Sequence, residues 1–173
     1  MNTKSLVKGS VFLALGLIIP YIFHSTGIPG TIFLPMHIPV LLCGFILGKK
    51  YGLLIGAITP FLNSVISGMP PIYPVAISMG FELATYGFLS GYLFKDKEYS
   101  IYTSLISAMI VGRFVSGISN YLLLSLGGKP YALGMFLGGA FIKPIWGILI
   151  QLALIPAIVK GLENSGMVVN INE

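Results

Sequence analysis

Three ionisable side chains lie inside long apolar stretches of the sequence: Glu82, Arg113 and Lys143. Charged groups are costly to place in hydrocarbon, so each of the three marks a candidate functional site. Two cations accompany one carboxylate, which leaves one cation without a protein partner. A bound anion would complete the set, and a guanidinium offers a carboxylate a planar pair of donors. The alternative is a structural ion pair, such as Glu82 with Arg113, that binds nothing.

Polar side chains accompany each of these residues at helical spacing, so each group shares one helix face. At 1.5 Å per residue, the expected depths below the outer surface are about 12 Å for Glu82, about 20 Å for Arg113 and about 18 Å for Lys143. Because these depths overlap, we expect the groups to converge on one cavity that opens to the outside. The predicted binding set comprises Asn63, Glu82, Tyr86, Arg113, Asn120, Lys143 and Trp146, with Ser78 and Ser116 on the same helix faces.

A proline-rich segment, SGMPPIYP at Ser67–Pro74, separates two apolar stretches near the same side. Consecutive prolines stiffen a chain, and Met69 is suited to cover an apolar ligand, so we expect a rigid lid. A plain outer turn explains the segment equally well. His37 lies between Pro35 and Pro39 near this face. We include His37 and Met69 among the predicted binding residues, although a single histidine is more often an interfacial residue.

The composition shows which elements must position these residues. Apolar residues make up 55% of the 173 positions and charged residues only 9%, whereas a soluble domain carries roughly a quarter charged residues. A membrane-spanning helix needs about 20 residues, so six spans use nearly the whole length as a single transmembrane domain over residues 1–173. We therefore predict an all-α integral membrane protein whose six spans cover about 6–23, 33–47, 51–66, 74–94, 99–126 and 131–159.

The lysines predict the orientation of these spans, because cytoplasmic connections are rich in lysine and arginine. The connections at 24–32 and 67–73 carry no charge, and 127–130 carries only Lys129. Both termini are therefore expected in the cytoplasm, and the net charge of +5 indicates membrane orientation rather than a nucleic-acid partner. The lysines on the cytoplasmic side are Lys4, Lys8, Lys49, Lys50, Lys95, Lys97 and Lys160.

Small residues recur at every fourth position in several spans, a spacing that lets helices approach closely in lipid. Packing within the bundle explains this pattern better than a dimerisation face. The second and third spans are short and contain Pro35, Pro39 and Pro60, which are tolerated where neighbouring helices or a polar cavity satisfy the freed backbone groups. The small-residue pairs are Gly44 and Gly48, Gly52 and Gly56, Gly87 and Gly91, and Gly134 and Gly138.

The sequence lacks the motifs that would predict catalysis. The sequence has no GxxxxGK[ST] phosphate loop and no HExxH zinc motif. Glu82 is the only carboxylate within the predicted spans, so an intramembrane protease that needs two acids lacks the second. Cys43 is the single cysteine, which excludes an internal disulfide and a CxxC redox motif. We therefore expect no enzyme, no cofactor and no metal site.

The stretch from Leu34 to Leu93 resembles the substrate-binding S components of energy-coupling factor (ECF) transporters. Four features match in order: HIPVLLCGFILG, a glycine-rich third span, SGMPP and FELATYG. GRFVSGISNYLL in the fifth span adds to the resemblance, which extends over essentially the whole chain.

The resemblance implies a role in the bacterial plasma membrane. An S component binds a vitamin or related micronutrient from outside and docks on a T component that carries two ATPases. Family members dock largely through small residues of the first helix, commonly in an Ala-x-x-x-Ala pattern. Ser10 and Ala14 have that spacing here, with serine departing from the pattern.

The resemblance also suggests candidate substrates. The motifs are most similar to those of pantothenate-type members, and the carboxylate of pantothenate suits Arg113 and Lys143. Pyridoxine, queuosine precursors, hydroxymethylpyrimidine and riboflavin are alternatives. A small intramembrane enzyme acting on lipid or peptide is the less favoured function.

Overall fold

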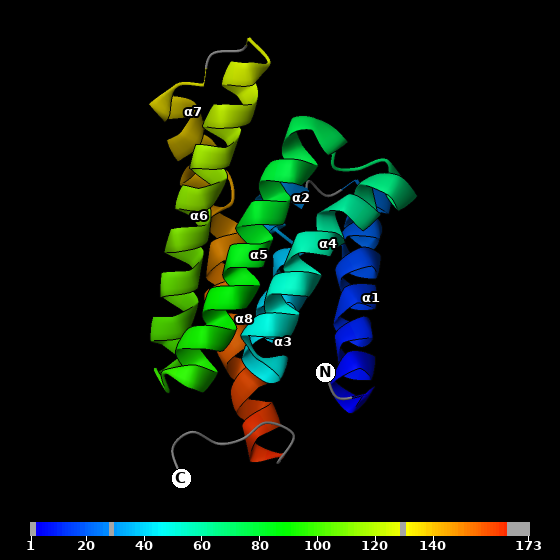
Figure 1. The fold of residues 1–173 in the computed structure, drawn as a ribbon, viewed down its shortest axis with the longest axis vertical. Helices are drawn as coiled ribbons and strands as arrows, with labels where there is room; N and C mark the ends of the chain where they lie inside the picture. The colour runs from blue at the N-terminus through cyan, green and yellow to red at the C-terminus, as the bar shows by residue number, and fades with distance from the viewer. Residues whose placement is uncertain (1–2, 28–29, 129–130, 166–173) are drawn as a thin grey trace.

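The computed structural model describes residues 3–27, 30–128 and 131–165, and these residues form helices and turns without a strand. The helices pack lengthwise into an elongated bundle (Figure 1). The α-helices are α1 (Thr3–Ser25), α2 (Gly30–Phe33), α3 (His37–Leu47), α4 (Lys49–Ser67), α5 (Ile77–Gly91), α6 (Ile101–Leu126), α7 (Leu133–Leu137) and α8 (Ile145–Asn164), and the π-helical turns are η1 (Ile72–Ala76), η2 (Tyr92–Asp96) and η3 (Gly138–Ile142).

Five segments of the described chain are long and apolar enough to cross a membrane: Thr3–Ser25, Gly30–Leu47, Ile72–Asp96, Ile101–Leu126 and Ile145–Asn164. The remaining long helix, α4, has 19 residues. It is less apolar because it contains lysines at its start and polar residues such as Asn63. The prediction of an all-α membrane bundle is therefore confirmed.

The last predicted span, 131–159, is not one continuous helix. α7 and η3 end at Ile142, a turn follows at Lys143 and Pro144, and α8 then runs from Ile145 to Asn164. Proline lacks a backbone N–H and has a fixed φ, so it suits the start of a helix and interrupts one that is already running. Pro144 explains why the predicted span divides at this point.

Lysines gather at one end of the bundle. Lys49 Nζ lies 2.6 Å from Asp96 Oδ2, and Lys95 Nζ donates a 2.7 Å hydrogen bond to the carbonyl of Ile46. The α3–α4 and α5–α6 connections are therefore neighbours. α1 begins and α8 ends at this same end of the bundle (Figure 1), as expected for an even number of membrane crossings.

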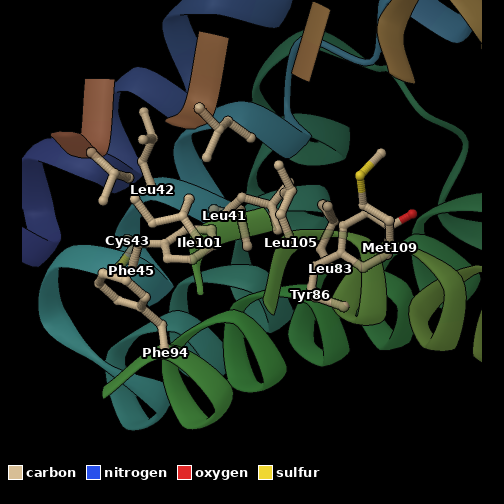
Figure 2. Packing of buried hydrophobic residues seen from close by; sticks show 14 of the residues in the cluster. Leu41, Leu42, Cys43, Phe45, Leu83, Tyr86, Phe94, Ile101, Leu105 and Met109 are labelled. Carbon is tan, nitrogen blue, oxygen red and sulfur yellow. The ribbon is translucent and has the colours of Figure 1, made fainter. Parts of the chain in front are cut away.

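The core lies between α3, α4, α5, α6 and α8, each of which contributes buried residues. Leu41, Phe45, Leu83, Tyr86 and Leu105 are fully buried in this cluster (Figure 2). α3 is the most enclosed of the spanning segments, whereas α1 buries only Gly9 and Gly16 against the bundle.

Glycines allow α4 and α5 to approach at backbone distance. A Cβ atom added to Gly87 would lie 2.1 Å from the carbonyl oxygen of Gly52, and one added to Gly56 would lie 2.2 Å from that of Leu83. Gly134 and Gly138, in contrast, have no neighbouring atom within 4 Å of such a Cβ. The small-residue spacing therefore marks close helix packing in α4 and α5 but not in α7 and η3.

Candidate functional site

A cavity of about 500 Å³ lies at the end of the bundle opposite the lysine cluster. Its walls come from the last turns of α1, from α2 and the residues before α3, from α5 and α6, and from η3. The SGMPP loop contributes Ser67, Met69, Pro70 and Pro71. Many elements thus meet here, and most of the wall is apolar, as is typical of a site for a small organic molecule.

Three buried ionisable side chains from three helices lie at the floor of the cavity. Arg113 Nη1 on α6 lies 2.8 Å from Glu82 Oε1 on α5, and His37 Nε2 on α3 lies 3.4 Å from the same oxygen. The exposed fractions are 6%, 3% and 2% for Arg113, Glu82 and His37, respectively. All three side chains line the cavity. We refer to them as the charged triad.

The triad leaves several polar atoms without a protein partner. Within the described residues, Arg113 Nε and Nη2 and His37 Nδ1 are buried and make no hydrogen bond. The two ion-pair contacts of the Glu82 carboxylate both fall on Oε1, and Oε2 takes part in neither ion pair. Buried polar groups are normally hydrogen-bonded, so unpartnered polar atoms beside a cavity make its floor the candidate binding site.

Tyr86 supports the triad from behind rather than lining the cavity. Its ring is fully buried and packs edge-on against His37 at a centroid distance of 5.4 Å. Gly112, the residue before Arg113, makes room for this ring, because a Cβ atom there would lie 2.0 Å from the Tyr86 ring. Tyr86 is not among the residues that line the cavity, since the sequence pattern gave its helix face but not its position below the cavity floor.

A second polar cluster joins α5 to α6 nearer the cavity mouth. Asn120 Nδ2 donates to Ser78 Oγ at 2.6 Å and to the carbonyl of Ser116 at 2.9 Å. The hydroxyls of Ser78 and Ser116 lie 3.4 Å apart. Ser116 and Asn120 line the cavity. The helical spacing in the sequence therefore identified a face that does reach the cavity.

The SGMPP loop lines part of the cavity. Gly68 ends α4 in a left-handed conformation, with φ of 72°. Ser67 Oγ then donates to the carbonyls of Asn63 and Met69, at 2.8 and 3.1 Å. Beyond the loop, the Tyr73 hydroxyl donates to the carbonyl of Leu123 on α6. These bonds tie the loop to α4 and the segment after it to α6.

Lys143 and Trp146 do not share the cavity with Arg113. Lys143 lies in the turn before α8 and is exposed, and Trp146 is 61% exposed on the outside of the bundle. The expected depth of Lys143 assumed one continuous helix, which the turn at Pro144 interrupts. At 1.5 Å per residue, Lys143 lies about 25 Å from Lys160 along the chain. The hydrocarbon layer is about 30 Å thick, so Lys143 lies near the membrane surface opposite Lys160. Of these two cations, only Arg113 therefore remains in the cavity, and the prediction of a second cation without a protein partner is not supported.

Asn63 is also outside the cavity lining. Its amide nitrogen donates to the carbonyl of Gly16 at 2.9 Å and to that of Thr59 at 3.1 Å. Thr59 is the side chain that faces Gly16, at 2.9 Å from a Cβ atom built there. Asn63 thus fastens the poorly buried α1 to α4. The sequence shows that Asn63 is a polar residue within a span, but it does not show that Asn63 faces α1.

Sequence reasoning missed several residues of the wall. Met79 precedes Glu82 by three positions, so helical spacing could have identified it. Met36 also lines the cavity, directly before His37. Tyr131 and Phe136 had no such signal, because only the folded chain brings the α7 region against α6. Phe136 packs where Gly117 leaves space, since a Cβ atom at Gly117 would lie 2.4 Å from its ring.

The predicted docking residues, Ser10 and Ala14, are exposed on α1 and lie outside the cavity. Ser10 Oγ donates to the carbonyl of Val7 within its own helix. Val7, Val11 and Ile18 are exposed on the same helix. This face is available to lipid or to a partner helix.

Comparison with known proteins identifies the family. Residues 4–160 match the model of the ECF transporter substrate-specific component. The chain belongs to this family. It is therefore a membrane-embedded, substrate-binding transporter subunit and not an enzyme. No curated protein and no solved structure gives a significant match.

Proposed function

We propose that this S component captures a small water-soluble vitamin from outside the bacterial plasma membrane. It would then deliver the vitamin by docking on a T component with two ATPases. The observation that carries the proposal is the cavity with the buried charged triad at its floor. Its volume of about 500 Å³ falls within the range of roughly 300–1,000 Å³ typical of small-molecule sites.

The orientation follows from the lysine cluster. Lysines mark the cytoplasmic side of a membrane protein, and the cavity is at the other end of the bundle. The mouth of the cavity would therefore face outward, where a nutrient is captured. The cavity floor would lie within the membrane, which keeps the bound molecule away from the energising subunits until the S component docks.

Pantothenate is the vitamin suggested by the sequence motifs, and as an anion it would require Arg113 to bind its carboxylate. Because Lys143 lies outside the cavity, Arg113 is the one cation that would bind the pantothenate carboxylate, rather than the two that the sequence suggested. Pyridoxine, queuosine precursors, hydroxymethylpyrimidine and riboflavin remain candidates. The cavity supports a ligand of vitamin size with a small number of polar groups.

The docking surface would be the exposed face of α1 that carries Ser10 and Ala14. Few of its side chains are buried against the bundle, and small residues permit close approach of a second helix in lipid. Ser10 and Ala14 lie outside the cavity lining, so docking through this part of α1 would leave the cavity free to hold its ligand.

The test is reconstitution with the partner subunits. We expect the chain to co-purify with a T component and two ATPases from the same genome, and the complex to accumulate a radiolabelled vitamin in liposomes only with ATP inside. A variant complex with inactive ATPases is the control. A chain that never forms this complex, or that binds no vitamin, would contradict the proposed function.

A further inference from the structure

The cavity contains one fixed positive and one fixed negative charge. In the described residues, the ionisable side chains that line it are Glu82, Arg113, Tyr131 and the two histidines, His24 and His37. The opposite charges of Glu82 and Arg113 cancel within this buried pair. The pair therefore has no net charge before a ligand enters.

The guanidinium of Arg113 is already engaged. Its Nη1 lies 2.8 Å from Glu82 Oε1, and both side chains are more than nine-tenths buried. An incoming carboxylate would compete with Glu82 for one cation and would give the buried site a net charge of −1. A cationic ligand would give it a net charge of +1. Either excess charge is unfavourable in a poorly solvated site.

The same pair still offers hydrogen bonds of both kinds. Arg113 Nε and Nη2 are donors without a partner in the described part of the chain. Glu82 Oε2 takes part in neither of the two ion pairs that the carboxylate makes. A ligand with one acceptor and one donor can therefore use both groups without separating them, and each bond is strengthened by the charge of the protein group.

We propose that the charged triad selects a ligand of zero net charge, either neutral or zwitterionic, that donates to Glu82 and accepts from Arg113. This proposal rests on the proposed function, because it names the chemical class of the captured vitamin. The apolar walls, which include Met36, Met79 and Phe136, suit a flat ring next to these polar groups. A hydroxylated heterocycle such as pyridoxine fits this description, and the pantothenate anion does not.

The test uses ligand pairs that differ in charge but little in shape. We would measure binding to the purified full-length chain by calorimetry for panthenol against pantothenate. The second series is pyridoxine against anionic 4-pyridoxate and cationic pyridoxamine. In at least one series we expect the uncharged or zwitterionic member to bind about tenfold or more tightly than the charged ones, which corresponds to about 1.4 kcal/mol.

Two variants reverse the charge balance at the floor of the cavity. Glu82→Gln leaves Arg113 uncompensated, so the preference should move to the anionic member of the series. Arg113→Gln leaves Glu82 uncompensated, so the preference should move to the cationic member. Arg113→Lys keeps the charge and should keep the wild-type order. A purely structural pair would instead weaken all members alike.

The outcomes separate the two proposals. If a charged member binds most tightly to the wild-type chain, the charge proposal is wrong while the vitamin-binding function stands. If no member of either series binds, nor any other water-soluble vitamin, the proposed function fails and the charge proposal fails with it. If Glu82→Gln does not fold, the wild-type series and Arg113→Lys still give the result.

Discussion

Replacing Gly87 by alanine should destabilise the bundle by separating two helices at their closest approach. The new Cβ atom would lie 2.1 Å from the Gly52 carbonyl oxygen, 2.3 Å from its carbonyl carbon and 2.7 Å from its Cα. All three atoms belong to the backbone of α4. A side chain can rotate away from such a contact, but a helix backbone cannot, so α4 and α5 must move apart.

The size of the effect follows from these distances. Ordinary contact with a Cβ atom begins near 3.4 Å, so the helices must separate by about 1.3 Å at this point, an overpacking that typically costs about 1–3 kcal/mol. For a chain of this length, such a loss lowers the melting temperature by roughly 2–12 °C. We expect the upper part of this range, because Gly56 and Leu83 lie at the same interface.

The assay is thermal unfolding of the detergent-solubilised chain, with Gly138→Ala as the matched control. Gly138 has open space around its Cβ position, so alanine there should shift the melting temperature by less than about 2 °C, as is usual for a substitution that makes no contact. Equal melting temperatures for the two variants would refute the argument from backbone contact. A selective loss in Gly87→Ala would support it.

Three further substitutions test the assignment of individual residues. Asn63→Ala removes the hydrogen bond to Gly16, which contributes roughly 1 kcal/mol, and should lower the melting temperature by about 2–4 °C. It should change ligand affinity less than twofold, and a large loss of affinity would show that Asn63 belongs to the binding site. Ala14→Trp should leave ligand binding intact but abolish uptake, whereas Val111→Trp on the exposed face of α6 should transport normally; uptake by Ala14→Trp would exclude docking through this face. Lys143→Ala should leave calorimetric affinity within about twofold, and a tenfold loss would contradict its position outside the cavity.

The helices could be predicted because hydropathy and proline positions are local signals. α1 and α6 end within three residues of their predicted bounds. α4 was also predicted in place, although its lysines and Asn63 make it less apolar than the others. One exception, the division at Pro144, shows the limit of this reasoning. An apolar run of 29 residues exceeds one span, but hydropathy alone does not say where the helix stops.

The site was only partly predictable, because helical spacing gives the face of a residue but not the helix opposite. Glu82, Arg113 and Asn120 point into the cavity, and the loop at Met69 covers it. Asn63 is equally polar, yet it faces Gly16 on α1. The partner of a side chain depends on how helices tilt and rotate in the bundle. That information lies in long-range packing, such as the fit of Tyr86 over Gly112.

From the sequence, Glu82 and Arg113 could form either a ligand site or a structural ion pair. In the structure they form an ion pair and also line the cavity. A transporter subunit must remain folded in the membrane when its cavity is empty. A lone cation at the cavity floor would then be an uncompensated charge, which is strongly unfavourable in a buried site. Pairing Arg113 with Glu82 removes that charge, while Nε and Nη2 remain free to bind. A ligand without net charge preserves the balance in the occupied state, so the same pair can stabilise the empty cavity and select what enters it.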